Sequence, residues 1–191
     1  YDKLSSEYYG DGKKVRRDYI ETITRLFCDN FISPITQWCE RHGLESTGHF
    51  YGEEDPLSGS LCAQSVYRQI KLMGIPGFDI IGRYVGDREH CALILGAKIV
   101  VSAAIQSGKK RILAECFALN PFNYGYDGLR KTADWLFALG IDTFAPHAFH
   151  YGYGAYQRTD AGKSFFYQDP LYGEYTEFAA YAGRISNLLS L

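Results

Sequence analysis

The chain has 191 residues, enough for one sizeable hydrophobic core and too few for two ordinary domains, so we expect a single domain over residues 1–191. Its 20 basic and 22 acidic residues are interspersed and leave a formal net charge of −2, without a basic stripe, which argues against a nucleic-acid partner. No stretch approaches the ~18 apolar residues of a membrane-spanning helix, so we expect no membrane partner either.

The first expected element is a helix from Arg17 to Arg41, because apolar residues recur there at spacings of three and four. Pro34 interrupts this run without changing its phase, which predicts one kinked helix or two abutting helices. Four strand–loop–helix units follow, with strands expected at 44–50, 77–81, 111–117 and 141–145 and helices at 64–73, 91–106, 127–139 and 174–189. The strands begin at intervals of about 30–34 residues, which is typical of βα units.

The connections between these elements differ in length with their direction. Those from helix to strand are short, whereas those from strand to helix are long, polar and aromatic. Elaborate loops at the carboxyl ends of strands are typical of a (β/α) barrel, whose active face lies there. A full barrel has eight strands in roughly 250 residues, so four units predict an α/β fold that is a partial (β/α)8 TIM barrel with about four parallel strands. We therefore expect a fragment that acts beside a missing N-terminal half of the barrel or self-associates.

Aromatic residues make up 16% of the chain, and sixteen of them are tyrosines. Many lie in Gly-rich loops rather than in the expected strands and helices. Rigid, amphipathic rings at this density in loops favour stacking against a ligand. The candidate stacking rings are Tyr124, Tyr126, Phe149, Tyr151 and Tyr153.

Glu115 ends the apolar segment Ile112–Ala114, where a buried and unpaired carboxylate would be costly. In a barrel the carboxyl ends of the strands meet at one mouth, so the polar residues of other strand ends should approach Glu115. These residues are His49, Glu53 and Glu54 after the first strand, Asp79 and Arg83 around the second, and His147 and His150 after the fourth. Carboxylates, imidazoles and stacking rings at one mouth suit glycoside hydrolysis, in which one carboxyl group is the acid and another is the base or nucleophile.

Each of these residues also has a purely structural interpretation. Glu115 can pair with Lys110 or Arg111, Glu53 and Glu54 can be solvated loop residues, and His49 can hydrogen-bond to backbone within a packed strand. His147 and His150 have the spacing of a metal pair, but no third ligand stands at a convincing spacing. We therefore expect no metal and no cofactor.

Four segments resemble the second half of a clan A-like glycoside hydrolase (β/α)8 barrel: HGLESTGHFYGEEDP (42–56), GFDIIG (77–82), AKIVVSAAIQSGKKRILAECFAL (97–119) and LGIDTFAPHAFHYG (139–152). The likeness is nearest to the α-L-rhamnosidase family (glycoside hydrolase family 106) and the family 42 β-galactosidases. It spans residues 1 to about 190. Its strongest parts are the run before and through Glu115 and the run at 140–149.

The resemblance implies roles for the strand ends. In such barrels the acid–base glutamate commonly ends strand four, and the nucleophile or base ends strand seven. Glu115 matches the strand-seven position, which implies the nucleophile of a retaining enzyme or the base of an inverting one. The strand-four carboxylate would then lie upstream of Tyr1, so we expect no turnover from this chain unaided.

Together these observations predict a glycosidase that acts on an oligo- or polysaccharide. Its catalytic candidates are Glu115, Glu53 and Glu54, and its candidates for carbohydrate binding are His49, His147, His150 and the five stacking rings. A barrel-derived carbohydrate-binding module is the alternative, in which Glu115 only accepts hydrogen bonds from sugar hydroxyl groups. A barrel lyase or aldolase is disfavoured, because no lysine ends a strand and no Gly-rich phosphate loop follows the last strands.

Overall fold

The structure is a computed structural model that describes residues 12–53, 65–82, 85, 92–120, 124–152, 154 and 164–190. It begins with helix α1 (Gly12–Phe27), the π-helical segment η2 (Cys28–Ile32) and helix α2 (Ser33–Arg41). Strands and helices then alternate in the order β1 (Thr47–Gly48), α4 (Val66–Ile70), β2 (Ile75–Ile81), α5 (Ala92–Gln106), β3 (Leu113–Ala118), α6 (Tyr126–Leu139), β4 (Thr143–Pro146) and α7 (Tyr172–Leu189). The expected order of elements is confirmed, whereas β1 and α4 are shorter than expected.

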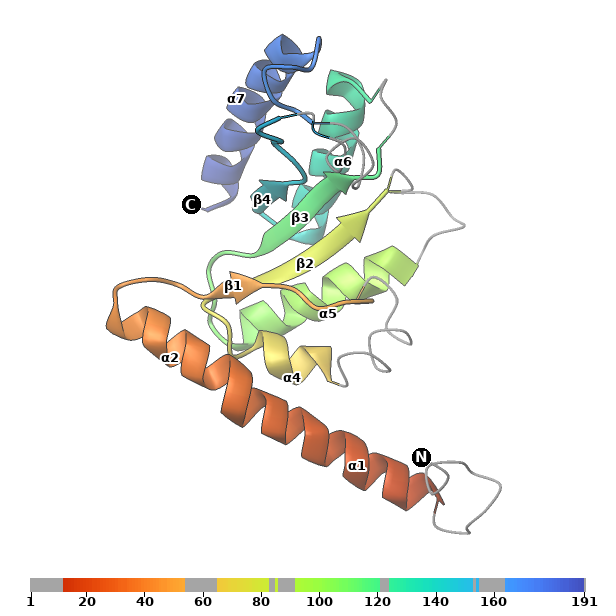
Figure 1. The fold of residues 1–191 in the computed structure, drawn as a ribbon, viewed down its shortest axis with the longest axis vertical. Helices are drawn as coiled ribbons and strands as arrows, with labels where there is room; N and C mark the ends of the chain where they lie inside the picture. The colour runs from red at the N-terminus through yellow and green to blue at the C-terminus, as the bar shows by residue number, and fades with distance from the viewer. Residues whose placement is uncertain are drawn as a thin grey trace.

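The four strands pair in parallel and in sequence order, and they form a curled sheet like that of half a barrel (Figure 1). The register pairs Asp79 with Glu115 and Glu115 with Ala145. Paired residues of parallel strands point to the same side, so these three share one face of the sheet. The partial-barrel α/β fold expected from the loop pattern is therefore confirmed.

Strand β1 is short because of its neighbour. Thr47 and Gly48 pair with Ile75 and Pro76 of β2, and Pro76 has no N–H group to donate to the ladder. At the next residue, Gly77, an added Cβ atom would lie 2.1 Å from the carbonyl oxygen of Gly48. The lost donor and this close backbone approach together account for a strand of two residues.

The N-terminal helix runs from α1 through η2 into α2, and α1 and η2 contact α4. Pro34 lies in the first turn of α2. In a regular α-helix its ring would clash with the carbonyl group four residues earlier, and the wider turn of η2 lies directly before it. A π-helical segment thus takes the place of the expected kink or break.

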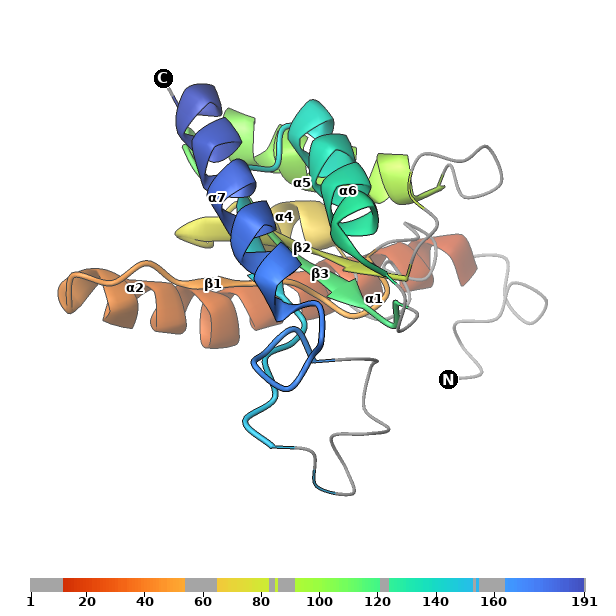
Figure 2. The ribbon, with the colours of Figure 1, turned by 90° about the horizontal axis from the view of Figure 1, so that it is seen from above.

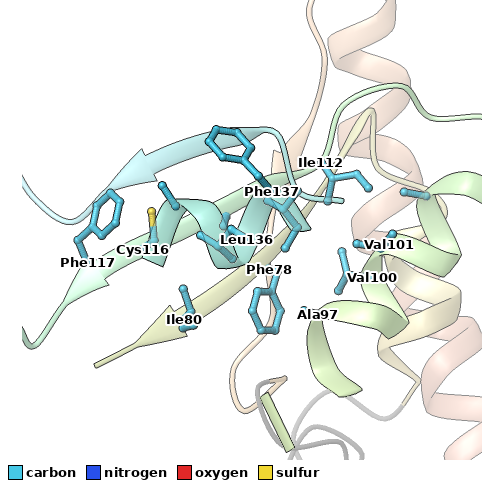
Figure 3. Close-up of a cluster of buried hydrophobic side chains, with 14 of the residues drawn as sticks. Phe78, Ile80, Ala97, Val100, Val101, Ile112, Cys116, Phe117, Leu136 and Phe137 are labelled. Atoms are coloured by element: carbon cyan, nitrogen blue, oxygen red, sulfur yellow. The ribbon is translucent and has the colours of Figure 1, made fainter. Parts of the chain in front are cut away.

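Helices α5, α6 and α7 lie on one side of the sheet, with α4 beside α5 (Figure 2). Phe78 and Ile80 of β2 and Cys116 of β3 point toward these helices and are almost fully buried. Figure 3 shows them with side chains from α5 and α6, including Val100 and Leu136, in the hydrophobic core. The apolar face of the sheet is therefore the one that the helices cover.

The opposite face is more polar. It carries the residues that alternate with the core-facing ones, namely Gly77, Asp79, Leu113, Glu115, Thr143 and Ala145. Apart from the buried Gly77, these residues are partly exposed. In the described part of the chain, no helix has both the length and the apolar content needed to cross a bilayer.

Strand β3 is irregular just beyond Glu115, where its register with β2 shifts. Phe117 and Leu119 have φ angles of 73° and 55°, values that residues with a side chain rarely adopt. Phe117 would otherwise share the face of Glu115, but its ring packs edge-on against Phe178 of α7. The irregularity thus removes a large ring from the polar face next to Glu115, as bulges beside functional sites commonly do.

Candidate active site

His49 and Glu115 meet at the carboxyl end of the sheet. His49 directly follows β1, Glu115 lies in β3, and β2 runs between them. Nε2 of His49 donates a hydrogen bond to Oε2 of Glu115 at 2.9 Å, and 33% of the Glu115 side chain stays exposed. Arg111, an alternative partner considered from the sequence, pairs with Glu45 instead. The Glu115 carboxylate, three residues before the end of β3, therefore has a partner and is still accessible.

Glu53 lies in the turn after β1, behind His49, and is only 3% exposed. Its Oε2 accepts the N–H group of Phe50 at 2.9 Å, and its Oε1 accepts the N–H group of Asp79 at 2.6 Å. Burial raises the pKa of Glu53 to about 8, although these hydrogen bonds and His49 oppose the rise. Glu53 is therefore not a solvated loop residue. Glu54, the next residue, lies outside the described residues.

The acidic surroundings of His49 change its protonation. Burial lowers the pKa of His49, but the hydrogen bond to Glu115 and the charges of Glu53, Asp79 and Glu115 together raise it above its ordinary value. Nδ1 of His49 is 3.6 Å from Oε1 of Glu53. Two groups this close titrate as a pair, so the protonation of each depends on that of the other.

Asp79 is expected at the mouth from the sequence but is not among the predicted catalytic or binding residues. Its side chain lies on the Glu115 face, and ligand atoms of His49, Asp79 and Glu115 are within 4.8 Å of one another. Strand alternation predicts this placement of Asp79, because its neighbours Phe78 and Ile80 point into the hydrophobic core and Asp79 must therefore point to the opposite face. A small divalent cation accepts such donors. The hydrogen bond between His49 and Glu115 uses one ring nitrogen and one carboxylate oxygen, and within the described residues Nδ1 of His49 is buried without a hydrogen-bond partner.

His147 and His150 follow β4 at the same end of the sheet. The N–H group of His147 donates to the carbonyl of Cys116 at 2.8 Å, which extends the pairing of β3 with β4. The two rings are nearly perpendicular, with centroids 6.4 Å apart. Within the described residues, Nδ1 of His147 and Nε2 of His150 are buried without a hydrogen-bond partner, and neither ring contacts Glu115 by a hydrogen bond. His147 and His150 therefore form a second cluster of polar side chains, separate from the pair of His49 and Glu115.

The candidate stacking rings divide into two sets. Tyr124 and Tyr126 pack against the hydrophobic core, and burial raises the pKa of Tyr124 above its ordinary value. Phe149 is 42% exposed and Tyr151 is 91% exposed. Tyr153 lies outside the described residues. Of the described rings, Phe149 and Tyr151 therefore offer the more open surface to a ligand.

Two surface hollows lie elsewhere. One of about 280 Å³ runs between β4 and α7 and includes Phe144 and Phe178. Another of about 500 Å³ lies at the start of α6 and includes Tyr126 and Glu174. Neither is lined by His49, Asp79 or Glu115, so neither is part of the candidate active site.

No family model, curated protein or solved structure gives a significant match to the chain. The candidate site therefore rests on its geometry alone.

Proposed function

We propose that the protein is a glycoside hydrolase that cleaves oligo- or polysaccharides by a two-carboxylate mechanism. The observation that carries this proposal is the Glu115 carboxylate, oriented by His49 and still accessible at the carboxyl end of a parallel sheet. Barrel enzymes take their catalytic groups from this end of the strands. In the proposed reaction Glu115 is the nucleophile or the base.

The mechanism needs a second carboxyl group as general acid. Retaining glycosidases hold their two carboxyl groups about 5–5.5 Å apart, and inverting ones about 6.5–9.5 Å apart. Asp79 and Glu115 have oxygen atoms within 4.8 Å of each other, which is nearer to the retaining separation. Asp79 is therefore the first residue to test as the acid, and Glu54 is the second. An acid within this chain would give turnover without the upstream carboxylate that the resemblance implies, contrary to the expectation from that resemblance.

Residues after β4 supply the proposed contacts to sugar. The exposed rings of Phe149 and Tyr151 can stack on the apolar face of a pyranose ring. His147 and His150 are each half-buried, so the exposed parts of their rings can bond to sugar hydroxyl groups. All four lie at the same end of the sheet as Glu115.

The test compares the native protein with Glu115→Gln and with the control Glu40→Gln, since Glu40 is an exposed residue of α2. Turnover is measured on a panel of aryl glycosides, and oligosaccharide binding is measured by calorimetry. Glu115→Gln should lower kcat by several orders of magnitude and leave binding largely intact, because the amide keeps the shape of the side chain but carries no charge. A loss of about tenfold or less in a folded variant would assign Glu115 a structural role.

A carbohydrate-binding module without catalysis is the second candidate, and the exposed rings of Phe149 and Tyr151 favour it. The same measurements separate the two functions. Binding without turnover, weakened by Tyr151→Ala and not by Glu40→Gln, would support the module.

A further inference from the structure

Among the described acidic residues of the candidate site, Glu53 is the one that is closed off from solvent. We propose that Glu53 is a positioning residue: it holds the turn that carries His49 against β2, and through His49 it orients the carboxylate of Glu115. This goes beyond the proposed function, which needs only that Glu115 be accessible and oriented.

The two oxygen atoms of Glu53 join two separate segments. Oε2 accepts the N–H group of Phe50 in its own turn, and Oε1 accepts the N–H group of Asp79 in β2, 26 residues away. The second bond attaches the turn to Asp79, the residue of β2 that pairs with Glu115. Because β1 has only two paired residues, the ladder alone holds this turn weakly.

The ring of His49 lies between two carboxyl groups. Nδ1 is 3.6 Å from Glu53, and Nε2 is 2.9 Å from Glu115. The Nδ1 distance is longer than a hydrogen bond, so Glu53 acts on the ring through its charge and through the turn that it holds, while the hydrogen bond at Nε2 sets the direction in which His49 donates. The charged groups that face His49 are Glu53 from its own turn, Asp79 from β2 and Glu115 from β3.

Direct contact of Glu53 with a substrate is disfavoured. Only 3% of the residue is exposed, and both oxygens are engaged by backbone N–H groups. His49 lies between Glu53 and Glu115, 3.6 Å from the first and 2.9 Å from the second. The effect of Glu53 on chemistry is therefore indirect, through the orientation and charge of the imidazole.

The test is an NMR titration of the five histidines in the native protein, in Glu53→Gln and in the control Glu40→Gln. A glutamine has the size of Glu53 but only one acceptor oxygen. Its NH₂ group would face one of the two backbone N–H donors, and that hydrogen bond would be lost. We expect the midpoint of His49 to fall by about 0.5–1 pH unit in Glu53→Gln, because a shifted turn loosens the hydrogen bond to Glu115 that raises the pKa of His49, while the other histidines stay unchanged. A His49 titration equal to that of the native protein would overturn the proposal.

A second measurement needs no variant and covers the case in which Glu53→Gln does not fold. Amide exchange of Phe50 in the native protein should be slowed at least about tenfold relative to an unstructured chain, although the residue lies at the start of a turn. Exchange of this amide at the unprotected rate would overturn the proposal.

The consequence for catalysis rests on the proposed function. Glu53→Gln should lower kcat by about tenfold or more, leave KM nearly unchanged, and shift one limb of the pH profile. If the native protein hydrolyses no glycoside, the proposed function fails, whereas the titration of His49 still decides the role of Glu53. If the native protein is active and His49 is unaffected by Glu53→Gln, only the positioning role fails.

Discussion

Glu53 makes the stability of the protein depend on pH. Its pKa in the folded protein is about 8, against an ordinary value of 4.5 that applies to the unfolded chain. Between these values the folded state binds more protons than the unfolded state, so the free energy of unfolding falls as the pH rises through this window. His49 acts in the same direction, because its raised pKa gives stability that is lost as the pH rises through the folded value.

We therefore predict that the protein is more stable at about pH 5 than at about pH 9, by a few kcal/mol. Glu53→Gln should remove most of this difference, because an amide does not titrate. Urea unfolding followed by circular dichroism at the two pH values measures the effect. The control Glu40→Gln should keep the pH dependence of the native protein. The same dependence in Glu53→Gln would contradict the assignment of the pKa to Glu53.

At the scale of single residues, the sequence predicts which side chains reach the mouth but not which of them touch. Strand ends bring His49 and Glu115 to one end of the sheet, yet their hydrogen bond crosses β2 and depends on ring orientation. The burial of Glu53 depends on two backbone donors that no spacing rule identifies. Asp79, in contrast, follows from strand alternation alone.

At the scale of the elements, the tightest contact is between β1 and β2. Gly77 leaves no room for a Cβ atom, which would lie 2.1 Å from the oxygen and 2.7 Å from the carbonyl carbon of Gly48. Both neighbours are backbone atoms, so a side chain at position 77 would push the strands apart. Since His49 follows Gly48 directly, such a shift would also move the imidazole away from Glu115.

We predict that Gly77→Ala destabilises the protein by more than about 2 kcal/mol and weakens the contact of His49 with Glu115. Gly183→Ala is the matched control, because Gly183 lies in α7 with open space where its Cβ atom would be. That change should stabilise the protein by about 0.5–1 kcal/mol through helix propensity. Thermal unfolding of both variants checks the prediction. Equal stability of Gly77→Ala and the native protein would contradict the close packing of β1 on β2.

The helices and strands themselves are largely predictable, because hydrophobic period and loop length act locally. The exceptions have identifiable causes. β1 is cut short by Pro76 and Gly77, which belong to its neighbour and not to its own sequence. The segment before Pro34 changes to π-helical geometry, which period alone does not distinguish from a kink. Features set by a partner strand or by backbone geometry are thus the ones that pattern analysis misses.

At the scale of the molecule, the sheet is open in the part of the chain that the structure describes. β1 and β4 each pair with one strand there, so each has an outer edge. The N–H groups of Thr143 and His147 donate to Ile112 and Cys116, so by alternation along the strand positions 144 and 146 face the outer edge. Pro146 has no N–H group, so the β4 edge lacks a donor at this position but can still pair with another strand along the rest of its length.

We predict that residues 1–191, expressed alone, associate through the β4 edge. Light scattering over a concentration series should show a mass that rises with concentration. Ala145→Lys, which puts a charge on the polar face of β4, should reduce this association. Ala138→Lys on the exposed side of α6 is the control and should leave it unchanged. A monodisperse monomer at every concentration would contradict the prediction.

The sequence order of the strands also has a consequence for how the protein forms during synthesis. Each strand pairs with the one made before it, so the sheet can grow in the direction of translation. The bond between His49 and Glu115 spans 66 residues and can close as soon as the third strand docks. A nascent chain that ends after residue 120 therefore already carries His49, Glu53, Asp79 and Glu115, and the last unit adds only the rings and imidazoles that follow β4.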